Sequence, residues 1–450
     1  MSFLSRRDYL LASAALTTAA RAADRQPNII WILAEDMSPQ LGCYGEPLIQ
    51  TPNIDKLAKE GTRFQNAFTT APVCSASRSA LATGMFQTTI GAHNHRTFRK
   101  QPLPAGVRLM TDRLREAGYY TVLGKQPLAT PKTDYNFIAE KPFDGSDWKD
   151  RPAGKPFFAQ LTFTQSHKGP GWPLGRKTTP NIDQSKLKLP PYWPDHPIAL
   201  DEYANYLEAI QAVDKQVGVL MDRLKTEGLL DDTLIIFMGD NGSCTFRGKQ
   251  FLYEGGIRVP LIVRWPGRLK PGTVREDLIT GVDLVGASLA AAGVAIPANM
   301  HGRDFLGDAP RRTHIFAARD RCDIATERLR CVRDSRYKYI RNFLPAIPYM
   351  QSNPYKEQEY ATWNLVKQLY KEGKLNPAQA RFAEDHKPVE ELYDLQQDPH
   401  EINNLAEVPA HAERRKAMRR MLDEWVQQSG DKGNLMEDPV EIYNDFFKRA

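Results

Sequence analysis

Three short, largely apolar runs, each followed by polar or charged residues, constrain this chain more than any other feature of its sequence. They cover residues 28–34, 157–163 and 233–238. Runs of this kind are typical of strands buried on both faces, as in a parallel sheet covered by helices. Because ligands bind such sheets at the carboxyl ends of the strands, the groups that follow the runs are expected to gather in one site.

The polar groups that follow these runs have the chemistry of a metal site. Glu35 and Asp36 follow the first run, His167 comes shortly after the second, and Asp240 and Asn241 follow the third. Their carboxylate and amide oxygens suit a hard divalent cation, Ca²⁺ before Mg²⁺. Taken singly, an acidic pair is more often a solvated loop, and Gly-Asp-Asn-Gly is a common turn. Their shared position after buried strands favours a binding site.

A second candidate element is the stretch 69–84, which predicts a short helix with Gly84 as its stop. Cys74 lies at or just before the first turn, where free N–H groups and the helix dipole favour negative charge. Arg78 follows one turn later on the same face. A lone Cys is more often a small buried hydrophobe than a nucleophile. Here the thiol, the helix start and the guanidinium together form a receptor for a tetrahedral oxyanion.

This stretch resembles the signature of type I sulfatases, Cys-x-Pro-x-Arg with a Leu-Thr-Gly close, here Cys74, Ala76, Arg78 and residues 81–84. In that family the Cys is oxidised after translation to formylglycine, whose aldehyde hydrate is the nucleophile. Ala76 stands where Pro is commonest, a form that occurs in bacterial members. The resemblance covers residues 27–430 and is greatest to bacterial sulfatases related to heparan N-sulfatase.

Further motifs follow in the order of this family. Residues 51–61 match its Thr-Pro-Asn-x-Asp-x-Leu-Ala helix, and residues 391–405 match its terminal signature. The segment 254–260 matches Glu-Gly-Gly-x-x-Val-Pro, which makes Lys249 the second sulfate-binding lysine.

The first sulfate-binding lysine has two candidates. Lys125 follows the predicted strand 119–123, where many sulfatases have Gly-Lys-x-His, although this chain lacks the His. Lys132 begins a Lys-Thr-Asp-Tyr-Asn variant of the same element, and only one of the two is expected to reach the site. Asp134 in this variant and His95 in a nearby loop are candidate substrate contacts and candidate bases for the elimination step.

The resemblance implies a sulfuric ester hydrolase that works by two displacements. The formylglycine hydrate attacks sulfur with Asp240 as the base, while Ca²⁺, Arg78, Lys249 and one further lysine hold the sulfate oxygens. His167 or Lys249 protonates the leaving atom, and the sulfated hemiacetal then eliminates sulfate. The implied metal ligands are Glu35, Asp36, Asp240, Asn241 and the residue derived from Cys74.

The implied fold is an α/β domain over residues 24–310, with a large mixed, mainly parallel sheet flanked by helices, as in alkaline phosphatase. The helical period over residues 202–228 predicts a helix that covers this sheet. Residues 311–450 are expected to form a C-terminal α+β subdomain with a small antiparallel sheet and a helix over 410–427.

Two arginines of this second part, Arg319 and Arg341, are candidates to contact a sugar ring or its carboxylate. The substrate class that the resemblance implies is a sulfated carbohydrate. The sugar, the position of the sulfate and the choice between O- and N-sulfate stay open.

Residues 1–23 resemble a twin-arginine signal peptide, with Arg6-Arg7, an apolar core from Leu10 to Ala20 and a small-x-small cleavage site. That core and every later apolar run are too short to form a permanent membrane anchor. The sequence therefore predicts a bacterial periplasmic or secreted enzyme. Its expected partners are the twin-arginine translocase, a sulfatase-maturing enzyme and the sulfated carbohydrate.

Composition excludes some functions and leaves two rivals. The net charge of +6 is small for 450 residues and shows no basic run of the kind that binds nucleic acid. The five cysteines lack metal-ligand spacing, and disulfides among those other than Cys74 stay open. The rivals are a phosphate or phosphonate ester hydrolase of the same superfamily and a sulfated-glycan-binding protein that has lost turnover.

Overall fold

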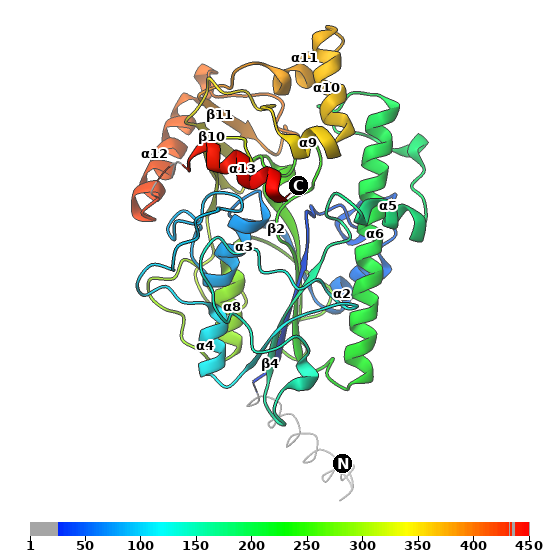
Figure 1. Ribbon diagram of the computed structural model, residues 1–450, viewed down its shortest axis with the longest axis vertical. Helices are drawn as coiled ribbons and strands as arrows, with labels where there is room; N and C mark the ends of the chain where they lie inside the picture. The colour runs from blue at the N-terminus through cyan, green and yellow to red at the C-terminus, as the bar shows by residue number, and fades with distance from the viewer. Residues whose placement is uncertain (1–25, 432, 434–436, 450) are drawn as a thin grey trace, which may run out of the picture.

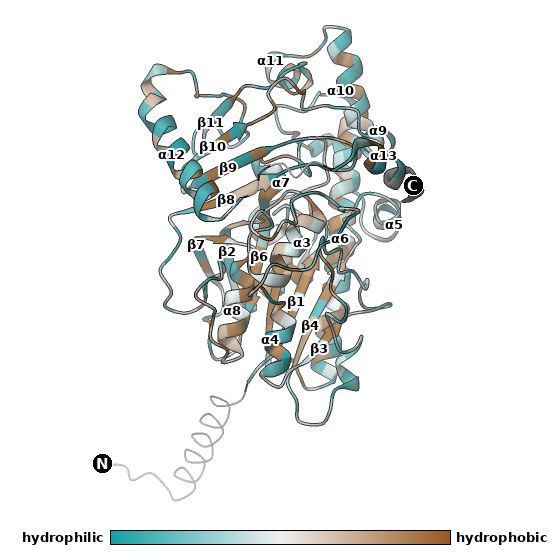
Figure 2. Ribbon diagram, turned by 60° about the vertical axis from the view of Figure 1, so that its left-hand side comes forward, coloured by the Kyte–Doolittle hydropathy of each residue, from teal (hydrophilic) through white to brown (hydrophobic). Residues whose placement is uncertain are grey.

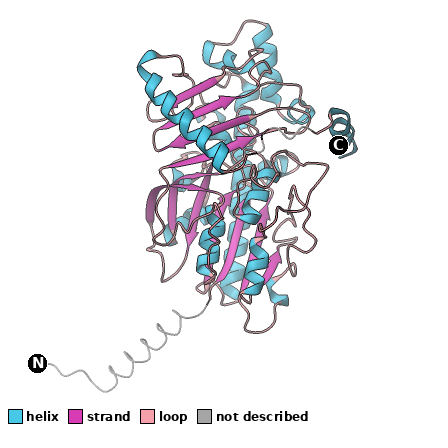
Figure 3. Cartoon of the chain, turned by 90° about the vertical axis from the view of Figure 1, so that its left-hand side faces the viewer, coloured by secondary structure: helices cyan, strands magenta, loops and turns pink. Residues whose placement is uncertain are grey.

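The computed structural model describes residues 26–431, 433 and 437–449, and it contains two sheets stacked along the long axis of the molecule (Figures 1 and 3). The predicted signal peptide lies outside the described residues. No helix among the described residues is long and apolar enough to cross a membrane.

The larger sheet has seven strands in the order β3-β4-β1-β5-β6-β2-β7. Its strands are β1 (Asn28–Ala34), β2 (Thr62–Phe68), β3 (Tyr120–Leu123), β4 (Phe157–Phe163), β5 (Thr233–Gly239), β6 (Arg258–Arg264) and β7 (Thr273–Thr280). β6 pairs antiparallel with both β5 and β2, while the other pairings are parallel. The prediction of a mixed, mainly parallel sheet is confirmed.

Helices cover both faces of this sheet, which explains why its central strands are apolar throughout. Every residue of β1, β4 and β5 is buried, and Figure 2 shows the strongly hydrophobic colouring of β1 and β4. One face packs against α2 (Pro52–Glu60) and α6 (Pro197–Thr226), with α5 (Gly171–Thr178) beside α6. The other face packs against α3 (Cys74–Thr83), α4 (Met110–Glu116) and α8 (Asp283–Ala291) (Figure 1).

The smaller sheet is antiparallel, with the order β11-β10-β9-β8. Its strands are β8 (His314–Arg319), β9 (Leu329–Asp334), β10 (Tyr337–Asn342) and β11 (Glu390–Asp394). Helix α12 (Ala412–Gln428) covers one face through Met418, Leu422 and Trp425. The predicted antiparallel sheet with its helix is thus confirmed, while a domain boundary near residue 310 stays a prediction.

The Pro and Gly residues of segment 169–197 predict an excursion over the surface, but the segment contains a packed helix. Trp172 and Gly175 of α5 are buried, and a Cβ at Gly175 would lie 2.8 Å from the Ala209 backbone of α6. Helix α6 begins earlier than expected because the His196 side chain caps it, accepting from the Ile198 amide at 3.2 Å.

Several short elements were not predicted. They are β7, α7 (Glu254–Ile257), α9 (Pro354–Glu359), α10 (Ala361–Lys371), α11 (Pro377–Ala380), α13 (Pro439–Arg449) and the 3₁₀ turns Gly42–Tyr44, Trp148–Asp150, Gln184–Lys186, Arg381–Ala383 and Pro409–His411. All five cysteines are free thiols, so the open question of disulfides is answered.

Candidate active site

The carboxyl ends of β1 and β5 meet the first turn of α3, and this junction gathers most of the predicted polar groups. Asn241 donates to Asp36 Oδ1 at 2.8 Å, and the Asp36 amide donates to Asp240 Oδ1 at 3.1 Å. Cys74 Sγ lies 3.7 Å from Asp36 Oδ1. Glu35 and these four residues are all buried. The apolar strands therefore deliver their terminal acids to the thiol, as their order predicted.

Arg78, one turn further along α3, contacts the acids that follow β1 and β5. Its Nε donates to Asp240 Oδ2 at 2.9 Å, and its Nη2 lies 3.2 Å from Glu35 Oε1. Its Nη1 donates to Thr162 Oγ1 at 3.0 Å. Sequence reasoning missed Thr162; the signal was a polar residue near the end of the otherwise apolar β4.

Two lysines supply further positive charge. Lys249 Nζ lies 2.9 Å from Asp36 Oδ2, and its side chain is buried. Lys132 forms an ion pair with Glu35 and lies 3.8 Å from Asp134 Oδ2. Lys125 is exposed on the turn after β3, and its side chain has no hydrogen bond or ion pair with a described residue of the cluster. The structure therefore brings Lys132, and not Lys125, to this cluster.

His167, His95 and Asp134 surround the cluster. His167 Nε2 lies 3.8 Å from Asp36 Oδ2, and its side chain is 27% exposed, so it marks the side open to solvent. His95 Nδ1 lies 3.1 Å from Ser75 Oγ, next to Cys74. Asp134 pairs with Lys132 and, at 3.5 Å, with Arg96. All three lie beside the cluster, and their contact with a substrate stays a prediction.

The two arginines predicted for sugar contact do not join the cluster. Arg319 is 2% exposed between the sheets and stacks on Phe251 at 4.9 Å. Arg341 shares the α12 face of β10 with Tyr339 and binds Asp423 of α12 at 2.7 Å. Strand alternation turns the Arg341 side chain toward α12, while its contact with a sugar stays a prediction.

The charges in the cluster compensate one another. Burial alone raises the pKa of Glu35, but Lys132 and Arg78 outweigh it and hold the pKa at about 2. Burial acts on Asp36 in the same way, and Lys249 holds the pKa of that carboxyl well below its usual range. Both acids are therefore ionised in the folded protein.

The pKa values of the Cys74 thiol and of Asp240 are raised, in contrast to those of Glu35 and Asp36. Burial raises the pKa of the Cys74 thiol far above its ordinary value, even though Lys249 opposes the shift. Because the thiolate is the reactive form, an unmodified Cys74 is a poor nucleophile at neutral pH. Burial also raises the pKa of Asp240, although Arg78 opposes it, which makes Asp240 the most basic carboxylate of the group.

The donor set fits a hard divalent cation. Donor atoms of Glu35, Cys74 and Asp240 lie within 4.8 Å of one another. Asn241 Oδ1 is buried and has no hydrogen-bond partner among the described residues. Such an oxygen costs free energy unless something binds it, and several oxygen ligands together suit Ca²⁺ or Mg²⁺.

Residues with strained backbone conformations lie at or beside the same cluster. Six non-glycine residues of the described chain have positive φ, and five of them lie at or beside the cluster. These five are Asp36, Arg96, Asp134, Gln250 and Asp323. Strained conformations persist where the surrounding structure fixes them, and they concentrate at functional sites.

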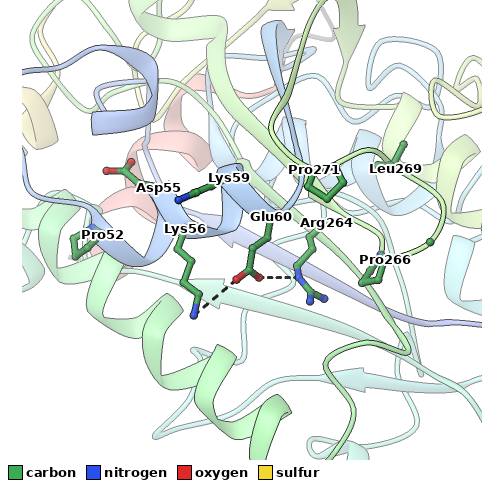
Figure 4. Close-up of a pocket in the computed structure, with 10 residues that line it drawn as sticks. Pro52, Asp55, Lys56, Lys59, Glu60, Arg264, Pro266, Leu269 and Pro271 are labelled. Atoms are coloured by element: carbon green, nitrogen blue, oxygen red, sulfur yellow. Dashed lines mark hydrogen bonds and ion pairs between the residues drawn. The ribbon is translucent and has the colours of Figure 1, made fainter.

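A separate surface pocket of about 780 Å³ lies near the ends of α2 and β6, at the end of the sheet away from the cluster. Figure 4 shows its ion pairs, in which Glu60 binds Lys56 at 3.8 Å and Arg264 at 3.1 Å. None of the predicted site residues lines this pocket.

The fold is a mixed α/β sheet between helices with a buried cluster of charged groups at its strand ends, and comparisons with known proteins specify the family. A family model named Sulfatase matches residues 27–144 and 143–294. A second model, N-sulphoglucosamine sulphohydrolase, C-terminal, matches residues 242–352. The chain belongs to the sulfatase family.

Individual relatives agree with this assignment. An ulvan-active sulfatase of Formosa agariphila is 34% identical over 466 residues, covering 92% of this chain and 77% of the relative. The human N-sulphoglucosamine sulphohydrolase is 26% identical over 476 residues, covering 90% of this chain and 91% of the relative. A structure solved in complex with its substrate D-glucosamine-2-N,6-O-disulfate has a TM-score of 0.65 and 20% identity, covering 92% and 99% of the two chains. The predicted family and the class of sulfuric ester hydrolase are confirmed.

Proposed function

We propose that this sulfatase removes sulfate from a sulfated carbohydrate, with formylglycine at position 74 as nucleophile and Ca²⁺ bound beside it. The observation that carries the proposal is the buried cluster in which Cys74 faces Asp36 while Arg78, Lys132 and Lys249 contribute three positive charges. Relatives named for their action on ulvan and on N-sulphoglucosamine support a sulfated sugar as substrate.

The state of Cys74 supports its conversion to formylglycine. In this two-electron oxidation the sulfur leaves and an aldehyde oxygen from water or the oxidant takes its place, and the maturing enzyme supplies the oxidant. A buried, protonated thiol cannot attack a sulfate ester efficiently. A hydrated aldehyde at the same place provides a hydroxyl group to do so.

Asp36, Asp240, Asn241 and Glu35 would hold the cation. When bound, Ca²⁺ supplies positive charge to the sulfate oxygens and to the attacking hydroxyl. The free Asn241 Oδ1 and the ionised Asp36 support this assignment.

Side chains of this protein bind the sulfate and transfer the protons. Lys132 and Lys249 are fixed by Glu35 and Asp36, so their ammonium groups are preorganised to bind sulfate oxygens. Asp240 accepts the proton of the attacking hydroxyl. His167, at the open side, protonates the leaving atom, and His95 or Asp134 serves as base for the elimination.

Mass spectrometry of the tryptic peptide Phe64–Arg78 tests the nucleophile directly. The protein is expressed with and without a sulfatase-maturing enzyme, and we expect the aldehyde mass at position 74 only with it. Turnover of an aryl sulfate should appear in the same samples and depend on Ca²⁺ after chelation and readdition. An unmodified thiol in an active sample would overturn the formylglycine proposal.

Comparison of aryl sulfate with aryl phosphate and aryl phosphonate tests the rival esterase. We expect kcat/KM to be highest for the sulfate. A preference for the phosphate or phosphonate would favour the esterase, and Ca²⁺ binding without any turnover would favour a glycan-binding protein.

We also propose export to the periplasm or the medium by the twin-arginine route. Replacing Arg6 and Arg7 with Lys should retain the protein in the cytoplasm, as cell fractionation would show. Unchanged export would contradict the proposal.

A further inference from the structure

The C-terminal segment carries an acidic residue into an enclosed site at the edge of the active site. Glu437 Oε2 accepts from Arg321 Nε at 2.7 Å and also from Arg321 Nη2, while Thr97 Oγ1 donates to Glu437 Oε1. The side chains of Arg321 and Glu437 are only 7% and 10% exposed. Both oxygens of this carboxylate thus have donors, two N–H groups of Arg321 on Oε2 and the Thr97 hydroxyl on Oε1, and this set of donors forms a carboxylate pocket.

This carboxylate pocket adjoins the catalytic cluster. The Arg321 carbonyl accepts from the His95 amide at 2.8 Å, and the His95 ring contacts Ser75, the neighbour of Cys74. Donor atoms of His95, Cys322 and Asp323 lie within 4.8 Å of one another, which places the loop after Arg321 against the same histidine.

The electrostatics of His95 connect the two regions. Burial lowers the pKa of His95 well below its usual range, and the charges of Arg96, Lys249, Arg321 and Lys132 lower it further. Cations of the catalytic cluster and of the carboxylate pocket therefore face one histidine. Glu437 neutralises Arg321 and Asp323 lies against His95, so an anionic group meets the charge of Arg321 on this side only where it replaces Glu437.

The segment that carries Glu437 buries Ile442 but leaves other side chains exposed. In Figure 1, α13 passes in front of the junction between the two sheets, above α3. Val440 and Tyr443 are 66% and 56% exposed. The ion pair between Arg99 and Glu441 on the same segment is exposed, and such pairs contribute little to stability.

We propose that Arg321 and Thr97 form a subsite for the carboxylate of a uronic acid next to the sulfated sugar, and that Glu437 occupies it as an internal competitor. This rests on the proposed function, since the sulfate of the same chain is held over Cys74. A substrate carboxylate displaces Glu437 and takes over its hydrogen bonds. The enzyme then favours chains in which a sulfated residue adjoins a uronic acid.

Isothermal titration calorimetry of the full-length protein tests the subsite without requiring turnover. The probes are a sulfated disaccharide that contains a uronic acid and the same disaccharide with its carboxyl group reduced to an alcohol. Glu437→Gln keeps the shape of the side chain but removes its charge. The measured quantity is the ratio of two affinities, that for the uronate divided by that for the reduced compound. We expect this ratio to be about tenfold higher in Glu437→Gln than in the original protein.

Two further variants make the outcome specific. Glu441→Gln removes a carboxylate from the same segment at an exposed ion pair, and it should leave the ratio of the two affinities unchanged. Adding Arg321→Lys to Glu437→Gln should abolish the gain, because an ammonium group cannot form the paired hydrogen bonds. Melting temperatures within the range of the original protein would show that the variants are folded.

An unchanged ratio in Glu437→Gln would overturn the subsite and leave the Arg321–Glu437 pair a structural contact. An equal gain in Glu441→Gln would also overturn it, because general loss of negative charge would then explain the effect. Failure of the proposed function would appear separately, as a missing aldehyde at position 74 or absent aryl sulfate turnover.

Discussion

Each buried acid of the active site is held by a specific cation, so single residues decide its charge balance. Glu35 binds Lys132 and Arg78, and Asp36 binds Lys249. Removing one partner of a buried pair leaves an uncompensated charge, which costs far more than the intact pair contributes.

Replacing Lys132 with Gln should impair catalysis strongly. The change removes a cation from the sulfate site and leaves Glu35 to Arg78 alone. We expect kcat/KM for an aryl sulfate to fall by about 10²- to 10³-fold, as measured by steady-state kinetics.

Lys125→Gln is the matched control, because Lys125 is exposed and lies outside the cluster. We expect its kcat/KM to stay within about twofold of the original value. A larger loss in this variant than in Lys132→Gln would show that the wrong lysine has been assigned.

The sequence could place the acids and the nucleophile but not every side chain. Glu35, Asp36, Asp240 and Asn241 follow buried strands directly, so the strand order fixes their position. The choice between the two lysines depends on the path of the loop after β3, which no local pattern specifies. The same holds for Arg341, whose direction depends on strand register.

At the scale of elements, α3 carries Cys74, the proposed nucleophile, and ends at a defined residue. Gly84 ends the helix with φ 72°, and its amide bonds to the Ala80 carbonyl. A Cβ at this position would lie 2.8 Å from Met300 Sδ. The left-handed conformation favours glycine here, and any side chain would also have to displace the end of the Met300 side chain.

Gly84→Ala should therefore destabilise the protein by more than the usual penalty of about 1–2 kcal/mol for a left-handed residue with a side chain. Gly373→Ala is the control, since Gly373 has φ 66° and open space around it. Urea unfolding should give a larger loss for Gly84→Ala, and equal losses would mean that Met300 simply moves aside.

The end of α3 is also fixed by a histidine that must stay neutral. His301 Nδ1 accepts from the Phe86 amide at 3.0 Å, and the Gly302 amide donates to the Gly84 carbonyl. Burial, followed by the charge of Arg312, lowers the pKa of His301 from 6.5 to about 4.

This shift predicts an acid-sensitive window. Between pH 6.5 and 4 the unfolded histidine binds a proton and the folded one does not. The stability that the neutral His301 contributes to the folded protein is therefore fully present above pH 6.5. It is lost as the pH falls toward 4. His301→Asn keeps an acceptor oxygen without titrating. Its melting temperature should fall less steeply over this range, whereas parallel curves would contradict the prediction.

Elements with continuous apolar runs or a clear helical period were predictable. Elements without either pattern were not. β1, β4 and β5 match the expected runs almost residue for residue. β7 was missed because its first half alternates between exposed and half-buried positions at the edge of the sheet. α5 was missed because Gly and Pro within it suggested a loop.

On the scale of the whole molecule, buried charges join the two sheets. Lys338 of β10 lies 2.8 Å from both Glu254 of α7 and Glu401. Arg247 donates to the carbonyls of His400 at 2.9 Å and Glu401 at 2.7 Å. The two parts should therefore unfold together.

Lys338→Met should destabilise this junction by about 3–5 kcal/mol, because it removes the cation that the buried Glu401 shares with Glu254. Arg336→Gln breaks an ion pair whose arginine is 41% exposed, and it should cost less than about 1 kcal/mol. Equilibrium unfolding in urea measures both. Similar losses would show that Lys338 does not join the sheets.

The complete burial of Cys74 has a consequence for the order of events during synthesis. Its side chain is 0% exposed, and its surroundings include Asp240 and Lys249, which the ribosome adds much later. An enzyme that converts this cysteine must therefore act while residues 233–249 are still unmade or unfolded. The proposed conversion of Cys74 would therefore compete with folding, and a variant that folds faster should leave more molecules with an unmodified thiol.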